Sequence, residues 1–222
     1  MTAVNVTAIK LKTLSPLNYY YIAAAGGMRT SNFLGDIALK YGFLHQMGYL
    51  DYPPPQKFQP DYKELNSFPF WFTVAVNEKT AFGNGKSTLF MKNMIRNTMQ
   101  GIDYNGTNRF PNAGEGSTMY KNFYFQQPIK PGNEFYCFFI SKKEFDLPKA
   151  VRMGNGKTGI LEITKTNKEF RGVLNYFTIS NVMKMQLPNY ELTFTEHNIL
   201  QYYLAGMFSK DNIMEIYNGW SY

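Results

Sequence analysis

The stretch Thr30-Ser-Asn-Phe-Leu-Gly-Asp-Ile-Ala-Leu-Lys-Tyr-Gly-Phe-Leu44 contains the clearest helical pattern in the chain. Thr30 or Ser31 can cap a helix at its start, because a hydroxyl there accepts a hydrogen bond from a backbone N–H of the first turn. The apolar positions that follow have the three-and-four spacing of one buried helix face: Leu34, Ile37, Ala38, Tyr41 and Leu44. The segment therefore predicts a helix packed on a sheet, and its flanks decide the kind of sheet.

The segments that flank this helix have the composition of β-strands. Val4 to Leu11 are rich in β-branched residues and predict a first strand, whereas Phe70 to Val76 predict a strand covered on both faces. Further elements are expected as strands over Glu134–Ile140, Thr158–Thr164 and Phe170–Ser180, and as a second helix over Thr195–Leu204. This order fits an α+β fold of the split βαβ, ferredoxin-like kind with a long insertion.

Length and composition limit the class of protein. The chain has 222 residues, of which 44% are hydrophobic, so it can bury a substantial core and favours a single domain over residues 1–222. Its 23 lysines and arginines exceed its 16 acids, and the net charge of +7 favours a polyanionic partner. The one cysteine, Cys137, excludes an internal disulfide and indicates a reducing compartment. No stretch resembles a secretory signal or a membrane span, which predicts a cytoplasmic protein with no membrane partner.

Most of the excess positive charge lies in the middle of the chain. Between Lys79 and Gly132, seven lysines and arginines stand against two acids, and eight aromatic residues are interspersed among them. Cations hold phosphates and flat rings stack on unpaired bases, so the mixture favours single-stranded nucleic acid, although at least half of the rings are expected in the core. Asn105–Ser117 is dominated by glycine, asparagine and proline, which indicates an exposed tip. We interpret residues 79–130 as one long basic insertion.

Two glycine-rich turns carry a lysine. The run Lys149-Ala-Val-Arg-Met-Gly-Asn-Gly-Lys-Thr-Gly159 lies between expected strands, and Gly83-Asn-Gly-Lys-Ser-Thr88 has a similar pattern. Neither is a Walker loop, because Val151 and Thr80 stand where that motif needs its first glycine. Glycines let a backbone approach closely and cations neutralise charge, so we expect contacts to a phosphate backbone. For either turn alone, a solvated lysine-glycine turn is the alternative.

Groups suited to catalysis are sparse. His45 ends the first expected helix near Tyr41 and Tyr49, and His197 begins the second. RNA cleavage through the 2′-hydroxyl needs a base and a partner for the leaving oxygen, for which His45 with a tyrosine is the candidate. A histidine at a helix end is more often a surface residue favoured by the helix dipole. No histidine or cysteine pair has the spacing of metal ligands, so we expect no enzyme, no metal site and no cofactor.

The order of these features resembles a known family. A first strand, the helix Asn32-Phe-Leu-Gly-Asp-Ile-Ala-Leu-Lys-Tyr-Gly-Phe43, a basic insertion, an apolar strand and then Val151-Arg-Met-Gly-Asn-Gly-Lys157 resemble the CRISPR-associated RAMP proteins. The chain is most similar to the type I-D Cascade subunit that caps the five-prime handle of crRNA, whose members carry an Arg-Leu-Gly-Lys type of loop. Met153 replaces the leucine here, Asn155 replaces the lysine, and the lysine is displaced to Lys157. The resemblance covers most of the chain and implies an RRM-like core with a protruding thumb.

The resemblance also implies a function. It indicates a non-catalytic crRNA-binding subunit of a type I CRISPR surveillance complex, acting in antiviral defence in the cytoplasm of a prokaryote. Its partners would be crRNA, a backbone subunit and a large subunit, with target DNA near the spacer-adjacent motif as a further candidate. The alternatives are a metal-independent endoribonuclease that processes precursor crRNA and a stand-alone single-stranded RNA-binding module. The residues expected to contact RNA are Arg152, Gly154, Asn155, Gly156, Lys157, Thr158, Arg29, Lys86, Lys92, Arg96 and Arg109.

A subunit of a complex should differ from a stand-alone module by an apolar patch that only the complex covers. The candidates for such a patch are the C-terminal residues, unless they close the sheet as a last strand: Met207, Phe208, Met214, Ile216, Tyr217, Trp220 and Tyr222. The exposure of these side chains decides between the two interpretations.

Overall fold

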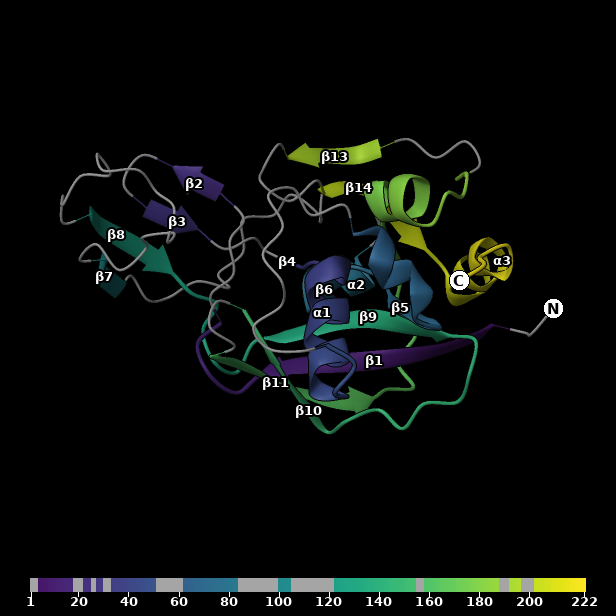
Figure 1. Ribbon diagram of the computed structural model, residues 1–222, viewed down its shortest axis with the longest axis horizontal. Coiled ribbons are helices and arrows are strands. Elements are labelled where there is room, and N and C mark those ends of the chain that lie inside the picture. The colour runs from purple at the N-terminus through teal and green to yellow at the C-terminus, as the bar shows by residue number, and fades with distance from the viewer. Residues whose placement is uncertain are drawn as a thin grey trace.

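The structure is a computed structural model, and it describes most but not all of the chain. The described residues are 4–17, 22–24, 27–29, 33–50, 62–83, 100–104, 122–154, 158–187, 192–196 and 202–222. They form a mixed α/β molecule with a large antiparallel sheet and two smaller sheets (Figure 1).

The large sheet is built around strand β1 (Asn5–Thr13). β1 pairs on one side with β9 (Glu134–Ser141) and on the other with β11 (Gly159–Lys165), in both cases antiparallel. The full order is β10-β11-β1-β9-β6-β4, and β5 also pairs with β9. The outer strands are β10 (Ala150–Met153), β6 (Ala75–Asn77), β4 (Phe33–Leu34) and β5 (Phe70–Phe72). The strands predicted near residues 4–11, 70–76, 134–140 and 158–164 are thus confirmed, with a break at Thr73 and Val74 between β5 and β6.

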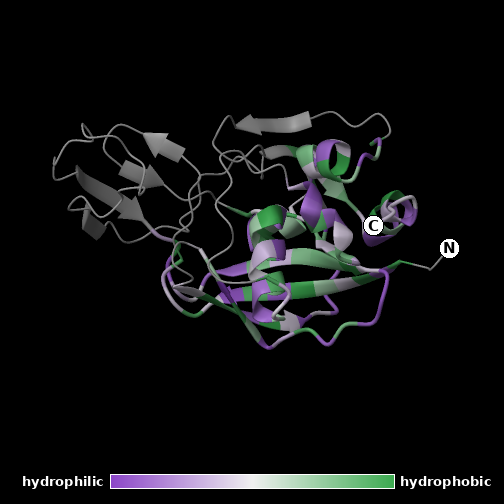
Figure 2. Ribbon diagram, in the orientation of Figure 1, coloured by the Kyte–Doolittle hydropathy of each residue, from purple (hydrophilic) through white to green (hydrophobic). Residues whose placement is uncertain are grey.

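The core lies on both faces of β9. On one face, the ring of Phe43 from α1 (Asp36–Gln46) lies 4.4 Å from the ring of Phe72, and it also stacks on Phe139. On the other face, Phe170 stacks on Phe138, with ring centroids 4.4 Å apart. Because each face of the strand is covered, the continuous apolar run of β9 is buried residue by residue. Figure 2 shows the hydrophobic residues along β1, β9 and the helix that crosses them.

Helix α1 begins later than the sequence predicts. Phe33 and Leu34 pair with Val76 and Ala75 as strand β4, so the chain is extended where the helix was expected to start. The helix starts at Asp36 after Gly35, which makes no side-chain cap. The predicted caps, residues 30 and 31, lie outside the described residues. The pairing partner of β4 comes from another segment of the chain, which local spacing cannot reveal.

Residues predicted as one strand between Phe170 and Ser180 divide into two elements. Strand β12 (Gly172–Asn175) is followed by a short π-helix, η4 (Thr178–Val182). The chain turns at Asn175, whose side-chain oxygen accepts a hydrogen bond from the N–H of Phe177 at 3.2 Å. The expectation of a strand through residue 180 is therefore wrong beyond Asn175.

The helix predicted over Thr195–Leu204 is also wrong. Strands β13 (Leu192–Glu196) and β14 (Tyr202–Phe208) occupy the described part of that segment, and they form a three-stranded antiparallel sheet with the order β12-β14-β13. Aromatic and branched residues pair there with distant strands, which overrides the local helical spacing. The second long helix is α3 (Lys210–Asn218), which begins with a capping box between Ser209 and Asn212.

The C-terminal residues mostly pack into the core and do not form the apolar patch expected of a subunit, so this segment does not favour a subunit of a complex over a stand-alone module. Phe208, Tyr217 and Trp220 are each 2% exposed or less, whereas Tyr222 is 49% exposed. The indole N–H of Trp220 donates to Asn66 at 2.7 Å, and its carbonyl accepts from Lys142. Asn66 belongs to the short 3₁₀ helix η1 (Lys63–Ser67), so the end of the chain is fixed onto the body.

The predicted insertion, residues 79–130, is described only in part. Helix α2 (Glu78–Phe82) leads into it, and it contains β7 (Gln100–Tyr104) and β8 (Asn122–Gln127). These two strands join β2 (Ile22–Ala24) and β3 (Gly27–Arg29) in a four-stranded sheet with the order β2-β3-β8-β7. Figure 1 places this sheet at the left, at the opposite end of the molecule from α3. The expected tip, residues 105–117, lies outside the described residues.

Candidate nucleic-acid interface

Arg152 lies on the face of the large sheet that points away from α1. Its neighbours on β10, Val151 and Met153, are buried toward the helix, where Gly42 passes so close that an added Cβ would lie 3.1 Å from the carbonyl oxygen of Arg152. Successive side chains of a strand point to opposite faces, so the exposed side chain of Arg152 points outward. This expected RNA contact is therefore held on a regular strand and not on a loop.

Two lysines of β1 share the face that carries Arg152. Arg152 is paired with Ile160 on β11, and the next outward positions across the sheet pair Lys12 with Glu162 and Lys10 with Thr164. Residues directly opposite one another on neighbouring strands point to the same side. Arg152, Lys12 and Lys10 thus lie on one face of the sheet, with Glu162 of β11 opposite Lys12, and we call this the basic face.

The basic face contains its own acidic partners. The ammonium of Lys10 lies 2.9 Å from a carboxylate oxygen of Glu134, and this hydrogen bond lowers the pKa of Glu134. The hydroxyl of Tyr136 donates to the other oxygen at 3.3 Å, and burial, together with nearby Glu134 and Glu78, raises the pKa of Tyr136 to about 12. Tyr136 therefore keeps its proton at neutral pH, and Lys10 is largely neutralised by Glu134. Lys12 also lies opposite two acids, Glu162 on β11 and Glu134 on β9, which leaves Arg152 as the clearest phosphate contact of this face.

The turn between β10 and β11 is anchored where it leaves each strand. Gly154 has a φ of +87°, a backbone conformation that residues other than glycine rarely adopt. The turn therefore requires glycine at this position. At the other end, the hydroxyl of Ser15 donates to the carbonyl of Thr158 at 3.0 Å and accepts from the N–H of Ile160 at 2.9 Å. The exposed Thr158 is thus fixed beside the end of β1, next to the basic face.

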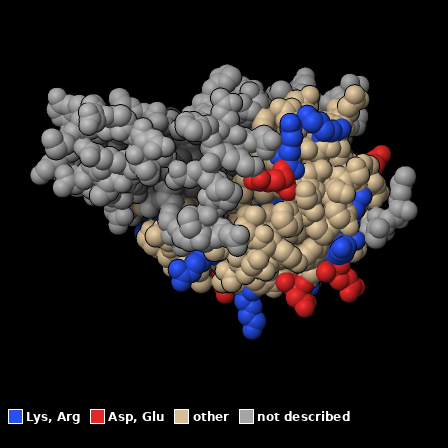
Figure 3. Space-filling model, viewed as in Figure 1, with Lys and Arg blue, Asp and Glu red and all other residues tan. Residues whose placement is uncertain are grey.

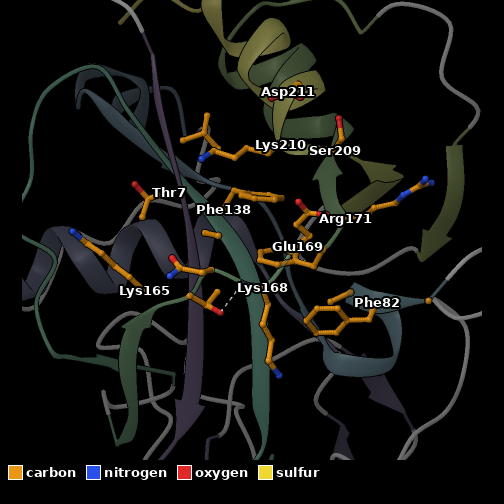
Figure 4. A pocket seen from close by; sticks show the side chains of 17 residues that line it. Thr7, Phe82, Phe138, Lys165, Lys168, Glu169, Arg171, Ser209, Lys210 and Asp211 are labelled. Carbon is orange, nitrogen blue, oxygen red and sulfur yellow. Dashed lines mark hydrogen bonds between the residues drawn. The ribbon is translucent and has the colours of Figure 1, made fainter.

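An open hollow of about 810 Å³ lies on the same face of the sheet, at the other end of β1. Ala8 and Phe138 line it, and Phe82, which is 37% exposed, stands at one side (Figure 4). The ammonium of Lys168 lies 5.5 Å from the ring centroid of Phe82 and 5.8 Å from that of Tyr136. These rings hold the cation by their negative faces, and the ammonium also lies 3.8 Å from a carboxylate oxygen of Glu78, which offsets its charge.

On the opposite face, which α1 covers, charges of both signs are mixed. Figure 3 shows lysines, arginines and acids interspersed over the described residues of that view, with no gathering of one sign. A phosphate backbone is attracted by clustered positive charge. The face with Arg152 also carries acids, Glu162 and Glu134, so the feature that makes it the candidate for nucleic acid is the exposed Arg152 next to Gly154 and not an excess of charge.

The structure describes only some of the expected RNA contacts. Arg152 and Thr158 are exposed, and Gly154 forms the turn between their strands. Arg29 lies in β3, of which only the backbone is described. The remaining expected contacts lie outside the described residues: Asn155, Gly156, Lys157, Lys86, Lys92, Arg96 and Arg109. Lys10 and Lys12 were not among the predicted contacts, although side chains two residues apart in an extended segment share one face, and Lys12 directly follows the predicted strand.

The residues considered for catalysis do not join the basic face. His45 lies in the last turn of α1, on the other side of the sheet, and the nearby Tyr41 donates its hydroxyl to Glu64 at 3.3 Å. Tyr49 is 55% exposed and its ring packs against Phe68, while His197 lies outside the described residues. Within the described part of the chain, no three His, Cys, Asp or Glu residues are grouped as they would be to hold a metal ion. Burial raises the pKa of the Cys137 thiol, which is enclosed in the core.

None of the described helices is long and apolar enough to cross a membrane.

A search of curated proteins gives no match to the chain. Among solved structures, the chain is similar to one described as a Type IV-B CRISPR Complex, with 8% sequence identity, a TM-score of 0.35, and coverage of 86% of this chain and 97% of that one. So distant a likeness carries no functional information. The family model of the Type I-D CRISPR-associated protein Cas5/Csc1, in contrast, matches residues 4–204, nearly the whole chain. The chain therefore belongs to the type I-D CRISPR-associated Cas5/Csc1 family.

Proposed function

We propose that this protein is a non-catalytic crRNA-binding subunit of a type I CRISPR surveillance complex, and that it grips the five-prime handle of the guide. The single observation that carries the proposal is the outward side chain of Arg152 on β10, next to Gly154 and on the same face of the sheet as Lys12. Cations on a rigid sheet face beside a close-approach turn suit a sugar-phosphate backbone. Membership of the Cas5/Csc1 family supports a role within a CRISPR system.

The strand order supports a ferredoxin-like, RRM-like core for this subunit. The strands that follow one another as β1, β6, β9 and β11 stand side by side in the order β11-β1-β9-β6, all antiparallel, and α1 lies between the first two in the chain. That is the 4-1-3-2 arrangement that a split βαβ unit produces. The core departs from the plan in one respect, because residues 142–154 lead from β9 through a loop into β10 and form no helix.

In this proposal the chain works in the prokaryotic cytoplasm, and its partners are crRNA, a backbone subunit and a large subunit. Target DNA near the spacer-adjacent motif is a further candidate. Residues 79–130 would act as the thumb that lies over the RNA, since most of the excess positive charge falls in that segment. We also propose that the protein does no chemistry on the RNA, because the histidine of α1 lies across the sheet from the basic face.

The salt dependence of RNA binding tests the assignment. A protein releases counterions for each phosphate it neutralises, so the log–log slope against salt falls by about 0.7 for each lost contact to a single strand. Arg152→Ala combined with Lys157→Ala should therefore weaken binding of repeat RNA and flatten the slope by roughly one to two. Lys184→Ala is the matched control, since Lys184 is exposed and outside the basic face, and it should leave the slope unchanged. An unaltered slope in the double variant would show that these residues do not hold phosphate.

A further inference from the structure

The first residues of β1 pair with a neighbouring strand on one side only. β9 pairs with β1 from Asn5 to Lys12, but the pairing of β11 starts only at Ile9. The N–H of Thr166 donates to the carbonyl of Ala8 at 3.0 Å, so the backbone groups of Ala8 point toward the β11 side. Backbone groups two residues apart in a strand point the same way, and those of Val6 therefore face the space beyond the end of β11. Within the described residues, Asn5–Thr7 is thus a short open sheet edge.

Two hollows lie along this open edge. The one of about 810 Å³ has Ala8 and Phe138 in its lining, and a second of about 580 Å³ has Phe139 and Met214. Phe138 and Phe139 are consecutive in β9 and stand on opposite faces of the sheet. Each hollow therefore has an apolar lining residue on its own face, and both reach the same stretch of β1.

This arrangement matches the addition of one more strand. The side chains of a strand alternate between the two faces of a sheet, so a segment laid against Val6 would place alternate side chains in the two hollows. Its backbone would continue the ladder of hydrogen bonds where β11 stops. Binding by strand addition works in this way, with the main chain giving affinity and alternate pockets giving specificity.

The charged residues around the Asn5–Thr7 edge and its two hollows indicate what kind of molecule binds there. The charged side chains that line both hollows are Lys165 and Lys210, and both are exposed. Figure 4 shows Thr7 of β1 between these two side chains. Acids also line the hollows, Glu169 and Asp211 in the first and Glu144 and Asp146 in the second, but lysines and arginines outnumber them in each. Nucleic acid is disfavoured because RNA cannot continue a β-ladder. An extended peptide with carboxylates at its centre complements two central lysines without requiring positive charge throughout.

We propose that the Asn5–Thr7 edge receives an extended, acidic, strand-forming segment of a protein partner, held between Lys165 and Lys210. The site is distinct from the proposed RNA contact at Arg152. That contact lies near the Thr13 end of β1, six residues and about 20 Å from Thr7 along an extended strand. The inference therefore extends to a protein partner and does not depend on RNA being bound.

A synthetic peptide of alternating glutamate and valine, about eight residues long, provides the probe. We expect it to bind the full chain, measured by fluorescence anisotropy, and to slow hydrogen exchange of the Val6 amide, measured by NMR. Lys165→Glu combined with Lys210→Glu should weaken binding about tenfold or more. The charge-matched control is Lys79→Glu with Lys184→Glu, two exposed lysines that line neither hollow, and it should bind as the unmodified chain does.

Two further probes keep the test independent of any loss of folding. A peptide of alternating lysine and valine should bind the Lys165→Glu, Lys210→Glu variant more tightly than the unmodified chain, which an unfolded variant could not do. A glutamate-valine peptide N-methylated on its central amides should not bind, because the ladder needs those donors. Equal binding of the first peptide by the double variant, or protection of the Val6 amide by a short single-stranded RNA and not by the peptide, would overturn the proposal.

Discussion

Asp36 is the residue whose replacement should destabilise the fold most clearly. Its carboxylate is 1% exposed and accepts hydrogen bonds from Trp71 at 3.3 Å, Asn175 at 3.0 Å and Thr178 at 2.5 Å. These donors come from β5, β12 and η4, so one carboxylate joins α1 to three other elements. Burial raises the pKa of Asp36, although the three donors act in the opposite direction.

Lys40 stands one helical turn from Asp36 and completes the buried network. Its ammonium donates to the carbonyls of Phe68 at 3.2 Å and Phe70 at 2.6 Å, and it lies 3.7 Å from the ring centroid of Trp71. Burial lowers the pKa of Lys40 well below its ordinary value, and nearby Asp36 acts in the opposite direction. Removing the carboxylate of Asp36 would leave three buried donors without their acceptor and the lysine without its counter-charge.

The expected loss of folding stability in Asp36→Ala follows from these lost interactions. Asp36→Ala should lower the free energy of unfolding by about 3–5 kcal/mol, because three buried donors lose their acceptor and each buried group left unsatisfied costs about 1–3 kcal/mol. With a urea dependence of about 2 kcal/mol per molar, the unfolding midpoint would fall by about 2 M. Asp146→Ala is the control, because Asp146 is exposed, and its change should stay within about 0.5 kcal/mol. A loss below about 1 kcal/mol in Asp36→Ala would refute the argument that this network joins the elements.

Three further predictions concern packing, pH and activity. Gly172→Ala should cost about 1–3 kcal/mol in urea unfolding, since the new Cβ would lie 2.7 Å from Ile213 and 2.8 Å from Phe138, whereas Gly219→Ala, with its nearest atom at 3.8 Å, should be tolerated. Lys10 lowers the pKa of Glu134 in the folded protein, so their contact stabilises the fold above the ordinary pKa of 4.5, and this stabilisation is lost as the pH falls through the lower pKa of the folded state. Lys10→Met should therefore raise the pKa of Glu134 in an NMR titration. Repeat RNA should remain intact with the purified protein in EDTA and in magnesium, and specific cleavage that disappears in His45→Ala would contradict the proposal that the subunit is not a nuclease.

The central strands could be predicted from the sequence because their burial is continuous. Every residue of β5 is buried, as is every residue of β9 after Glu134, so apolar side chains occupy both faces and the pattern persists however the strands pair. The α1 helix could be predicted for a similar reason, since its spacing is local. Its start could not, because Phe33 and Leu34 are fixed by pairing with a strand some forty residues away.

The helix predicted near the C-terminus was wrong because strand pairing with distant residues determines the structure of that segment. Ile199, Leu200, Tyr203 and Leu204 have helical spacing, yet Leu204 lies in β14 and pairs with Phe194 and Asn175 on two neighbouring strands. Pairing of that kind depends on partners that the local pattern does not contain. At the candidate interface, Arg152 could be found from its glycine turn, but the lysines of β1 became visible as its neighbours only through the register of β1 with β11.

The two proposed binding sites follow from how β1 is supported along its length. Its middle is fixed by the core, where Ile9 and Leu11 are fully buried between β9 and β11, and the two proposed sites lie toward its ends. At one end β10 and β11 place Arg152 on the same face as Lys12; at the other, β11 stops and, within the described residues, leaves the backbone of Val6 without a paired strand on that side. Sites about 20 Å apart on a rigid strand share no contacts, so the effects of variants at the two ends should add. A loss of peptide binding in the Lys165→Glu, Lys210→Glu variant with unchanged RNA affinity would therefore be the expected mark of two separate functions on one strand.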